Sequence, residues 1–202
     1  MKTIKFLLMG NKNVGKSTLL DTYLWKLKYG MAYHDHTSEE IRYIIDVIEI
    51  ETVEELRSHL TEHIEMKNIY FVCFNVNDRK TLHTARNEWI LQLLQHNPKT
   101  RIFLVGLQCD LRDQILTKLK QDCVSHNDGV TISRYYENVQ YLECSSNRLD
   151  SVENLFDKAI KIVLYEDGRN ENEQKIIEFY EQIQISFKFK RCDCENVCEE
   201  CE

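Results

Sequence analysis

The sequence lacks several features that would point to particular classes of protein. It contains no run of about eighteen apolar residues, the length that a transmembrane helix needs. Positive charge is not in excess: 26 Lys and Arg stand against 33 Asp and Glu, and a chain of net charge −7 is a poor candidate for binding nucleic acid. The apolar N-terminal stretch is short and has no small-residue cleavage site, so we expect a buried first strand there and no signal peptide. Internal repeats and low-complexity segments are also missing.

What is present is the composition of an ordinary globular protein. The 202 residues are 43% hydrophobic and 29% charged, enough for one domain with a buried core. Eight cysteines fall into two groups. Four are scattered, most of them in or beside apolar runs, and we expect them to be reduced core residues of a cytoplasmic protein: Cys73, Cys109, Cys123 and Cys144. The other four crowd the C-terminus: Cys192, Cys194, Cys198 and Cys201.

Strand-like and helix-like segments alternate along the chain. Apolar or β-branched runs predict buried strands at 3–9, 41–50, 69–74, 102–106 and 140–144. Apolar stripes at helical spacing predict helices at 16–27, 54–67, 81–95, 113–123 and 151–165, the last one capped by Ser151. A further helix is expected at 175–184, before a tail without clear periodicity. The alternation predicts an α/β fold with a mostly parallel sheet, helices on both faces, and ligands at the carboxyl ends of the strands.

The residues after the first predicted strand match a phosphate-binding loop. They read GNKNVGKS from Gly10 to Ser17, the pattern GxxxxGK[ST], between a strand and a helix. Glycines let the backbone curl so that N–H groups face phosphate oxygens, and the helix adds its positive N-terminus. We expect Lys16 to reach the outer phosphates and Ser17 to bind Mg²⁺; a chance match in a glycine-bearing turn is the alternative. The expected nucleotide contacts are Asn11, Lys12, Asn13, Val14, Gly15, Lys16, Ser17 and Thr18.

Two later segments carry further motifs. VGLQCDLR at 105–112 and YLECSS at 141–146 each follow or end a predicted strand. Together with the phosphate loop they resemble the Rho branch of the Ras superfamily, where these segments read roughly VGTKxDLR and YxECSA. The resemblance implies a P-loop GTPase (G-domain) fold over residues 1–165, with GTP or GDP and Mg²⁺ as ligands. It implies that Asp110 accepts the guanine N1 and N2 protons, and that Ser145 and Ser146 direct backbone N–H groups at the guanine oxygen. A helix cap is the alternative role for Asp110.

Other segments extend the resemblance. IYFVCF at 69–74 resembles the family's fourth strand, and VENLFDKAI at 152–160 resembles its closing helix. Residues 119–121 and 125–134 occupy the place of the extra helix that distinguishes Rho proteins from Ras. Thr37 is the expected counterpart of the family's Mg²⁺-binding threonine. The neighbouring His34, Asp35 and His36 fit a solvated loop better than a metal site.

The sequence departs from the family in the residues that surround the γ-phosphate. Lys12 stands where relatives keep a small residue, and its side chain is expected to crowd that phosphate. In place of the family's DxxGQ segment, an ungapped alignment offers Glu49 for Asp, Thr52 for Gly and Val53 for the water-orienting Gln. A shift of three residues offers Asp46 in place of Glu49.

Two more departures affect the base and the sheet. Leu107 and Gln108 replace a polar residue and a lysine that flank the guanine ring in most relatives, although we expect Gln108 still to contact the nucleotide. The chain is shorter than typical relatives between residues 33 and 49. The hairpin of the second and third strands is therefore expected to be trimmed or lost. Residues 166–202 are expected to form a C-terminal helix and a Cys-rich tail beyond the G domain.

These features favour an atypical Rho-like signalling switch or scaffold in the cytoplasm. By the resemblance it binds GTP or GDP with Mg²⁺ and has protein effectors and an exchange factor as partners. The departures around the γ-phosphate predict that it hydrolyses GTP weakly or not at all. One alternative is a pseudo-GTPase that serves only as an interaction module, against which the intact Gly15-Lys16-Ser17 argues. Another is a P-loop kinase of a small molecule. That class needs an arginine-rich lid, which the sequence does not offer after the third strand.

The C-terminal cysteines generate a prediction about membranes. Lys188, Lys190 and Arg191 precede them, which resembles sites of reversible palmitoylation, and no C-terminal prenylation motif is present. Nearby acids oppose binding to an anionic leaflet, and a metal clip or an unmodified tail are the alternatives. If the tail is acylated, changing all four cysteines to serine releases the protein from the membrane fraction of cells. An unmutated protein found wholly in the aqueous fraction contradicts acylation.

Overall fold

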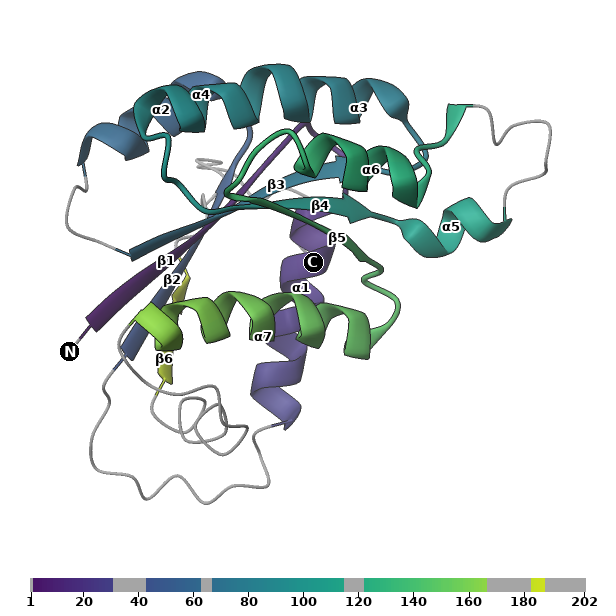
Figure 1. Ribbon diagram of the computed structural model, residues 1–202. Helices are drawn as coiled ribbons and strands as arrows, with labels where there is room; N and C mark the ends of the chain where they lie inside the picture. The colour runs from purple at the N-terminus through teal and green to yellow at the C-terminus, as the bar shows by residue number, and fades with distance from the viewer. Residues whose placement is uncertain (1, 31–42, 63–66, 115–121, 167–182, 188–202) are drawn as a thin grey trace, which may run out of the picture.

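The computed structural model describes residues 2–30, 43–62, 67–114, 122–166 and 183–187. They form one six-stranded sheet in the order β5-β4-β3-β1-β2-β6, in which every neighbouring pair is parallel (Figure 1). The strands are β1 Lys2–Met9, β2 Tyr43–Ile50, β3 Lys67–Asn75, β4 Ile102–Leu107, β5 Val139–Cys144 and β6 Ile183–Phe187. The helices are α1 Lys16–Gly30, α2 Val53–Glu62, α3 Arg79–Thr84, the π-helical stretch η2 Ala85–Ile90, α4 Leu91–His96, α5 Cys109–Gln114, α6 His126–Ser133 and α7 Leu149–Glu166.

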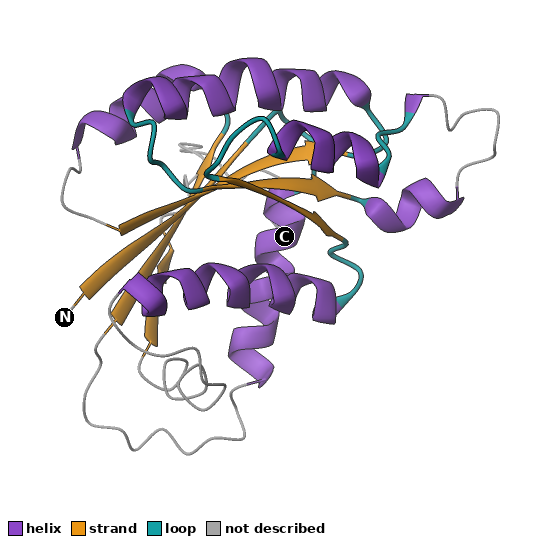
Figure 2. Cartoon of the chain, viewed as in Figure 1, coloured by secondary structure: helices purple, strands orange, loops and turns teal. Residues whose placement is uncertain are grey.

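Helices cover both faces of the sheet, as predicted (Figure 2). Alternate side chains of a strand point to opposite faces, so each strand serves two apolar layers. Phe6 and Leu8 of β1 pack with α1 and α7, whereas Leu7 and Met9 pack with α2 and the continuous helix α3-η2-α4. The two layers hold the strands so that β1, β2, β3 and β4 end at one edge, where the predicted site residues follow.

The four scattered cysteines are free and buried, as predicted. Burial raises the pKa of the Cys144 thiol to about 11 and also raises that of Cys73. Both thiols are therefore protonated at neutral pH and act as small apolar core residues. The C-terminal cysteines lie outside the described residues.

The outer edge of β2 is closed by a strand that the sequence reading did not predict. β2 lies parallel to β1 on one side and to β6 on the other, from Tyr43 opposite Ile183 to Val47 opposite Phe187. No antiparallel strand pair occurs in the described ranges, so the hairpin that was expected to be trimmed or lost is not seen there. The predicted helix over 175–184 is wrong at its end, because Ile183 and Gln184 belong to β6; residues 175–182 lie outside the description.

Three further boundaries differ from the prediction. α7 begins at Leu149, so Ser151 lies inside its first turn and is not its cap. The helix expected at 113–123 begins earlier, as α5 from Cys109, and Cys123 is not helical. The helix expected to reach Lys67 ends by then, because Lys67 opens β3.

The helix α6 is the crossover connection between β4 and β5 and not an extra helix. It packs on β5 and β4, the parallel neighbours that it joins. A capping box fixes its start, in which Ser125 and Asp128 each accept a hydrogen bond from the other's backbone N–H. The expectation that 125–134 stands in the place of an extra helix is therefore wrong, and 119–121 lie outside the described residues.

The pairing of β6 can be tested by cross-linking. Neighbouring strands lie about 4.8 Å apart, within the Cα separation that a disulfide spans. Asp46 and Ser186 face each other in register. A variant carrying Asp46→Cys and Ser186→Cys should give a cross-linked peptide on mild oxidation, identified by mass spectrometry. The out-of-register variant carrying Asp46→Cys and Gln184→Cys is the control. Equal cross-linking of the two variants contradicts this register.

Candidate functional site

The loop between β1 and α1 has the curled backbone expected of a phosphate cradle. Its φ angles are positive at Gly10 (146°), Asn13 (62°) and Gly15 (106°), a region in which residues with a side chain are strained. A Cβ on Gly10 would overlap the carbonyl group of Cys73 in β3, so glycine is needed there for space as well. α1 begins at Lys16, and the unpaired N–H groups and positive dipole end of this helix face the loop.

Lys16 fills the centre of this loop. Its side chain is 2% exposed, and Nζ donates to the carbonyl oxygens of Gly10 at 2.9 Å and Asn11 at 3.1 Å. Oε1 of Glu49 lies 3.6 Å from the same ammonium. A buried charge is costly unless it has hydrogen bonds and an opposite charge, and this one has both. The loop therefore presents a fixed cation among backbone N–H groups, which is the arrangement that phosphate oxygens need.

Glu49 connects this cation to the hydroxyl of Ser17. Ser17 Oγ donates to the Glu49 carboxylate, at 3.0 Å from Oε1 and 3.1 Å from Oε2. Hydroxyl and carboxylate oxygens are ligands that Mg²⁺ accepts, so the pair fits a Mg²⁺ site beside the cradle. Asp46 lies in register with Lys5, three residues back along β2. The structure thus supports the ungapped alignment, in which Glu49 takes the place of the family's Asp.

Lys12 leaves the cradle. Its side chain is 76% exposed, and Nζ lies 3.7 Å from Oε2 of Glu51 just beyond β2. In this conformation the side chain does not enter the space of the γ-phosphate, contrary to the crowding expected from the sequence. The neighbouring Asn11 differs from Lys12 in burial: its Oδ1 is buried and has no hydrogen-bond partner among the described residues. Val14 is buried, while Thr18 is exposed at the start of α1.

The segment between β2 and α2 is a helix cap. Thr52 Oγ1 accepts from the N–H of Glu55 at 3.2 Å, and Glu55 Oε2 accepts from the N–H of Glu51 at 3.1 Å. The carbonyl of Thr52 accepts from the N–H of Leu56, a fully buried residue that ties the helix to the core. This is the reciprocal pattern of a Thr-x-x-Glu capping box, displaced by one residue at its return bond. Val53, where the family's Gln is expected, is the first residue of α2.

The base-binding segment follows β4. Gln108 has a φ of 63°, and its Nε2 donates to the carbonyl of Val14 at 3.4 Å, so it links this segment to the phosphate loop. Asp110 lies in the first turn of α5, and its Oδ2 accepts from Nδ2 of Asn147 at 2.8 Å. Burial alone would raise the pKa of Asp110, but hydrogen bonds from Ser145 and Asn147 outweigh it and hold the pKa below its ordinary value. Asp110 is therefore an ionised acceptor at neutral pH.

The two serines after β5 have different roles in the structure. Ser145 is fully buried, and its N–H donates to Oγ of Ser151 at 3.1 Å. The carbonyl of Ser146 accepts from Oγ1 of Thr22 in α1 at 3.2 Å, so this loop is also held to α1. Because the N–H of Ser145 is engaged, Ser146 is the better candidate for a contact with the guanine oxygen.

A partly buried ion pair joins the two segments that are predicted to bind the base. Arg112 of α5 binds Glu143 of β5 through two bonds of 2.8 and 2.7 Å, with side chains 18% and 15% exposed. Tyr141 OH donates to the same carboxylate at 2.8 Å, and Arg112 also donates to the carbonyl of Val124 at 2.9 Å. Burial would raise the pKa of Glu143, but these bonds from Arg112 and Tyr141 hold it below its ordinary value. Sequence reasoning quoted both residues within motifs without pairing them. Their opposite charges were the available signal.

Several of the predicted site residues lie outside the described residues. Thr37 and the neighbouring His34, Asp35 and His36 are not among the described residues, so the structure does not place them at the site.

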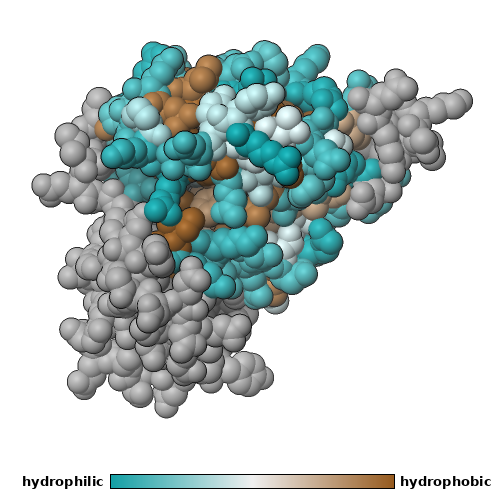
Figure 3. All heavy atoms as spheres, in the orientation of Figure 1, coloured by the Kyte–Doolittle hydropathy of each residue, from teal (hydrophilic) through white to brown (hydrophobic). Residues whose placement is uncertain are grey.

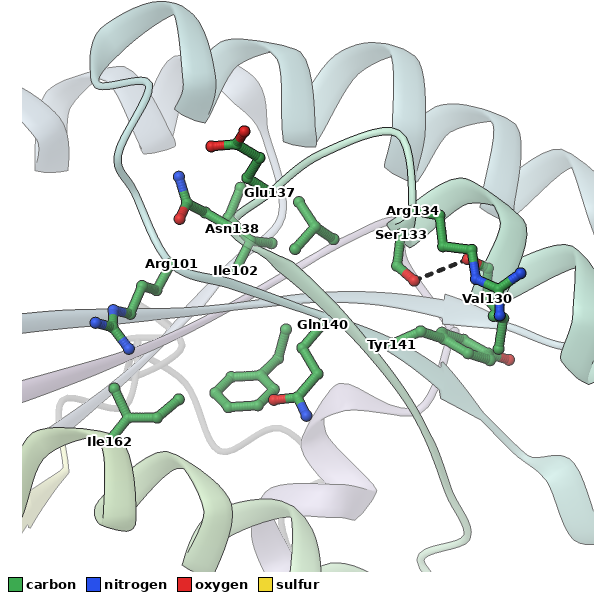
Figure 4. A pocket seen from close by; sticks show the side chains of 12 residues that line it. Arg101, Ile102, Val130, Ser133, Arg134, Glu137, Asn138, Gln140, Tyr141 and Ile162 are labelled. Carbon is green, nitrogen blue, oxygen red and sulfur yellow. Dashed lines mark hydrogen bonds between the residues drawn. The ribbon is translucent and has the colours of Figure 1, made fainter. Parts of the chain in front are cut away.

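A cavity of about 640 Å³ opens at the amino ends of β4 and β5, against α6 and α7 (Figure 4). None of the predicted nucleotide contacts lines it. The face shown in Figure 3 is mostly polar. No helix in the described ranges is long and apolar enough to cross a bilayer.

Comparison with known proteins identifies the family to which the chain belongs. Residues 5–165 match the profile of the Ras family. The Rho-related protein racM of Dictyostelium discoideum is 29% identical over 174 residues, which cover 80% of this chain and 90% of that protein. The matched range includes the phosphate cradle, Glu49, the segment around Asp110 and the two serines after β5. The chain therefore belongs to the Ras family of small GTPases and is similar to its Rho-related members.

Proposed function

We propose that this protein binds GTP and GDP together with Mg²⁺ and acts as an atypical Rho-like switch or scaffold with little hydrolysis of its own. The observation that carries the proposal is the burial of Lys16 within the cradle. A core side chain of this length could be apolar without loss of packing. An ammonium held there by carbonyls and one carboxylate is explained by a ligand that carries strong negative charge.

The phosphate end of the site has the groups that a diphosphate needs. Backbone N–H groups of the loop and of the first turn of α1 supply donors, and Lys16 supplies charge. Ser17 and Glu49 would hold Mg²⁺, joined by Thr37 if its predicted role is right. The metal, when bound, would neutralise part of the phosphate charge.

The base end favours guanine. The ionised carboxylate of Asp110 can accept from two neighbouring N–H donors, which guanine offers at N1 and N2 and adenine does not. Gln108 can lie along the base because its side chain already bridges to the phosphate loop. Asn147 donates from its Nδ2 to this carboxylate at 2.8 Å and is a contact that the sequence reading missed.

Weak hydrolysis follows from the start of α2. Turnover in this fold requires a water positioned in line with the γ-phosphate and donors for its developing charge. Val53 has neither a donor nor an acceptor in its side chain, and Thr52 is held by the capping bonds to Glu55. Glu51 is paired with Lys12 at 3.7 Å. Effectors, an exchange factor and a cytoplasmic or peripheral membrane location remain parts of the proposal that rest on the resemblance.

The nucleotide content of the purified protein tests this proposal. We expect chromatography of the released ligand to show GDP or GTP. Lys16→Ala should weaken nucleotide binding about a hundredfold, because it removes charge-assisted bonds to the outer phosphates. Lys99→Ala is the matched control, since this exposed lysine lies in the turn before β4, at the other end of the sheet from the cradle, and should affect binding little. Asp110→Asn should reduce the preference for guanine. Equal affinity of the unmutated protein for ATP and GTP overturns the proposal, and no nucleotide binding at all supports the interaction-module alternative.

The rate of GTP hydrolysis tests the proposal that turnover is weak. In a single-turnover assay of bound GTP, we expect a rate at least about tenfold below that of an ordinary Rho-type protein measured in parallel, because nothing orients the water. A Rho-type activating protein should accelerate it little. An ordinary rate, or strong acceleration, would show that another residue positions the water, with Glu51 and His36 as the nearest candidates.

A further inference from the structure

The segment that is proposed to bind the base has a demanding backbone shape, and Leu107, just before its turn, carries no polar side chain to support it. Leu107 is 1% exposed and packs in the core, so its side chain offers no hydrogen bond to the segment. The next residue, Gln108, has a φ of 63°, a conformation that costs a residue with a Cβ about 1 kcal/mol. Something outside the segment must stabilise this turn. We propose that Asn77, just beyond the end of β3, is the positioning residue that fixes the base-binding segment and so sets the aim of Asp110.

The contacts of Asn77 connect it directly to the turn. Its Nδ2 donates to the carbonyl oxygen of Gln108 at 3.1 Å. The same carbonyl accepts from the N–H of Leu111 at 3.1 Å, so it is also the first hydrogen-bonded carbonyl of α5. Asn77 therefore holds the residue from which α5 starts, and Asp110 lies two positions further on in the first turn.

Asn77 is itself held rigidly. Oδ1 of Asn75, the last residue of β3, accepts from the backbone N–H of Asn77 at 2.9 Å and from its Nδ2 at 3.2 Å. Between them, Val76 donates its N–H to the carbonyl of Leu107 at 3.1 Å and accepts from the N–H of Val124 at 2.7 Å. Because its side-chain amide contacts both Asn75 and Gln108, Asn77 fixes the position of Gln108 relative to the end of β3. The other side-chain tie of Gln108, to Val14, is longer at 3.4 Å.

The consequence concerns base selectivity, and it rests on the proposed function. A carboxylate selects guanine only if both its oxygens meet the N1 and N2 donors at once, so a small rotation of α5 costs one of the two bonds. The exocyclic 2-amino group is the donor that distinguishes guanine from hypoxanthine. Loss of the hydrogen bond from Asn77 to Gln108 should therefore lower the preference for GDP over inosine diphosphate. It should have a smaller effect on the affinity that comes from the diphosphate group.

The experiment compares dissociation constants for GDP and inosine diphosphate in the full-length protein. Asn77→Asp keeps the size of the side chain but replaces the donor by an acceptor facing the Gln108 carbonyl. We expect the preference for GDP to fall about fivefold or more, the scale of one well-made hydrogen bond. The matched control is Asn138→Asp. Nδ2 of Asn138 also donates to a backbone carbonyl, that of Pro98, at 3.1 Å, but at the other end of the sheet. It should leave the preference within about twofold.

A third variant separates positioning from packing. Asn77→Ala removes the donor without adding a repulsive acceptor, so its loss of preference should be smaller than that of Asn77→Asp. If Asn77 only fills space, Asn77→Ala should lower the preference for GDP more than Asn77→Asp does. It should then also lower the midpoint of thermal unfolding more. An unchanged preference in Asn77→Asp, with GDP still favoured by the unmutated protein, overturns this inference alone. An unmutated protein that does not favour GDP overturns the proposed function and this inference with it.

Discussion

A buried ammonium at the end of the first strand is the constraint on which the site depends. Lys16 can stay charged inside the loop only because two carbonyls and the Glu49 carboxylate surround it. Those partners come from the turn after β1 and from the neighbouring strand β2. The parallel pairing that places Leu8 beside Glu49 is therefore part of the site as much as part of the fold. The same register brings Glu49 to the hydroxyl of Ser17 and so forms the pair of oxygen ligands to which we assign Mg²⁺ in the proposed function.

The start of α2 is held by capping hydrogen bonds of its own, and these bear on the proposed weak hydrolysis. A glycine next to the γ-phosphate leaves backbone N–H groups free to move toward it, whereas Thr52 commits that backbone to capping a helix. Arg57 further along α2 donates to Gln92 of α4 at 3.1 Å, which ties this helix to its neighbour. A segment satisfied by its own hydrogen bonds gains little from a third phosphate. These hydrogen bonds are the physical reason why we propose weak GTP hydrolysis for this chain.

Much of this molecule could be predicted from sequence because its signals are local. The phosphate loop, the buried strands and the segment around Asp110 each carry their pattern within ten residues. What was missed depends on partners far along the chain. No motif surrounds Asn77, and its bond to the carbonyl of Gln108 joins residues that are 31 positions apart. The side chain of Lys12 could not be oriented without knowing that Glu51 lies beside the loop.

The strand β6 was missed for a different reason, since its signal is local but was outweighed. Residues 183–187 read IQISF, the apolar–polar alternation of a strand, and the predicted helix over 175–184 covers its first two residues. Tertiary context decides such a short segment. β2 has β1 on one side, and without a partner on the other its N–H and C=O groups would form an open edge, which is a template for aggregation. A short strand from the C-terminal segment closes that edge, and it does so on the strand that carries Glu49. The stability of the sheet edge and the geometry of the phosphate site are thus joined through β2.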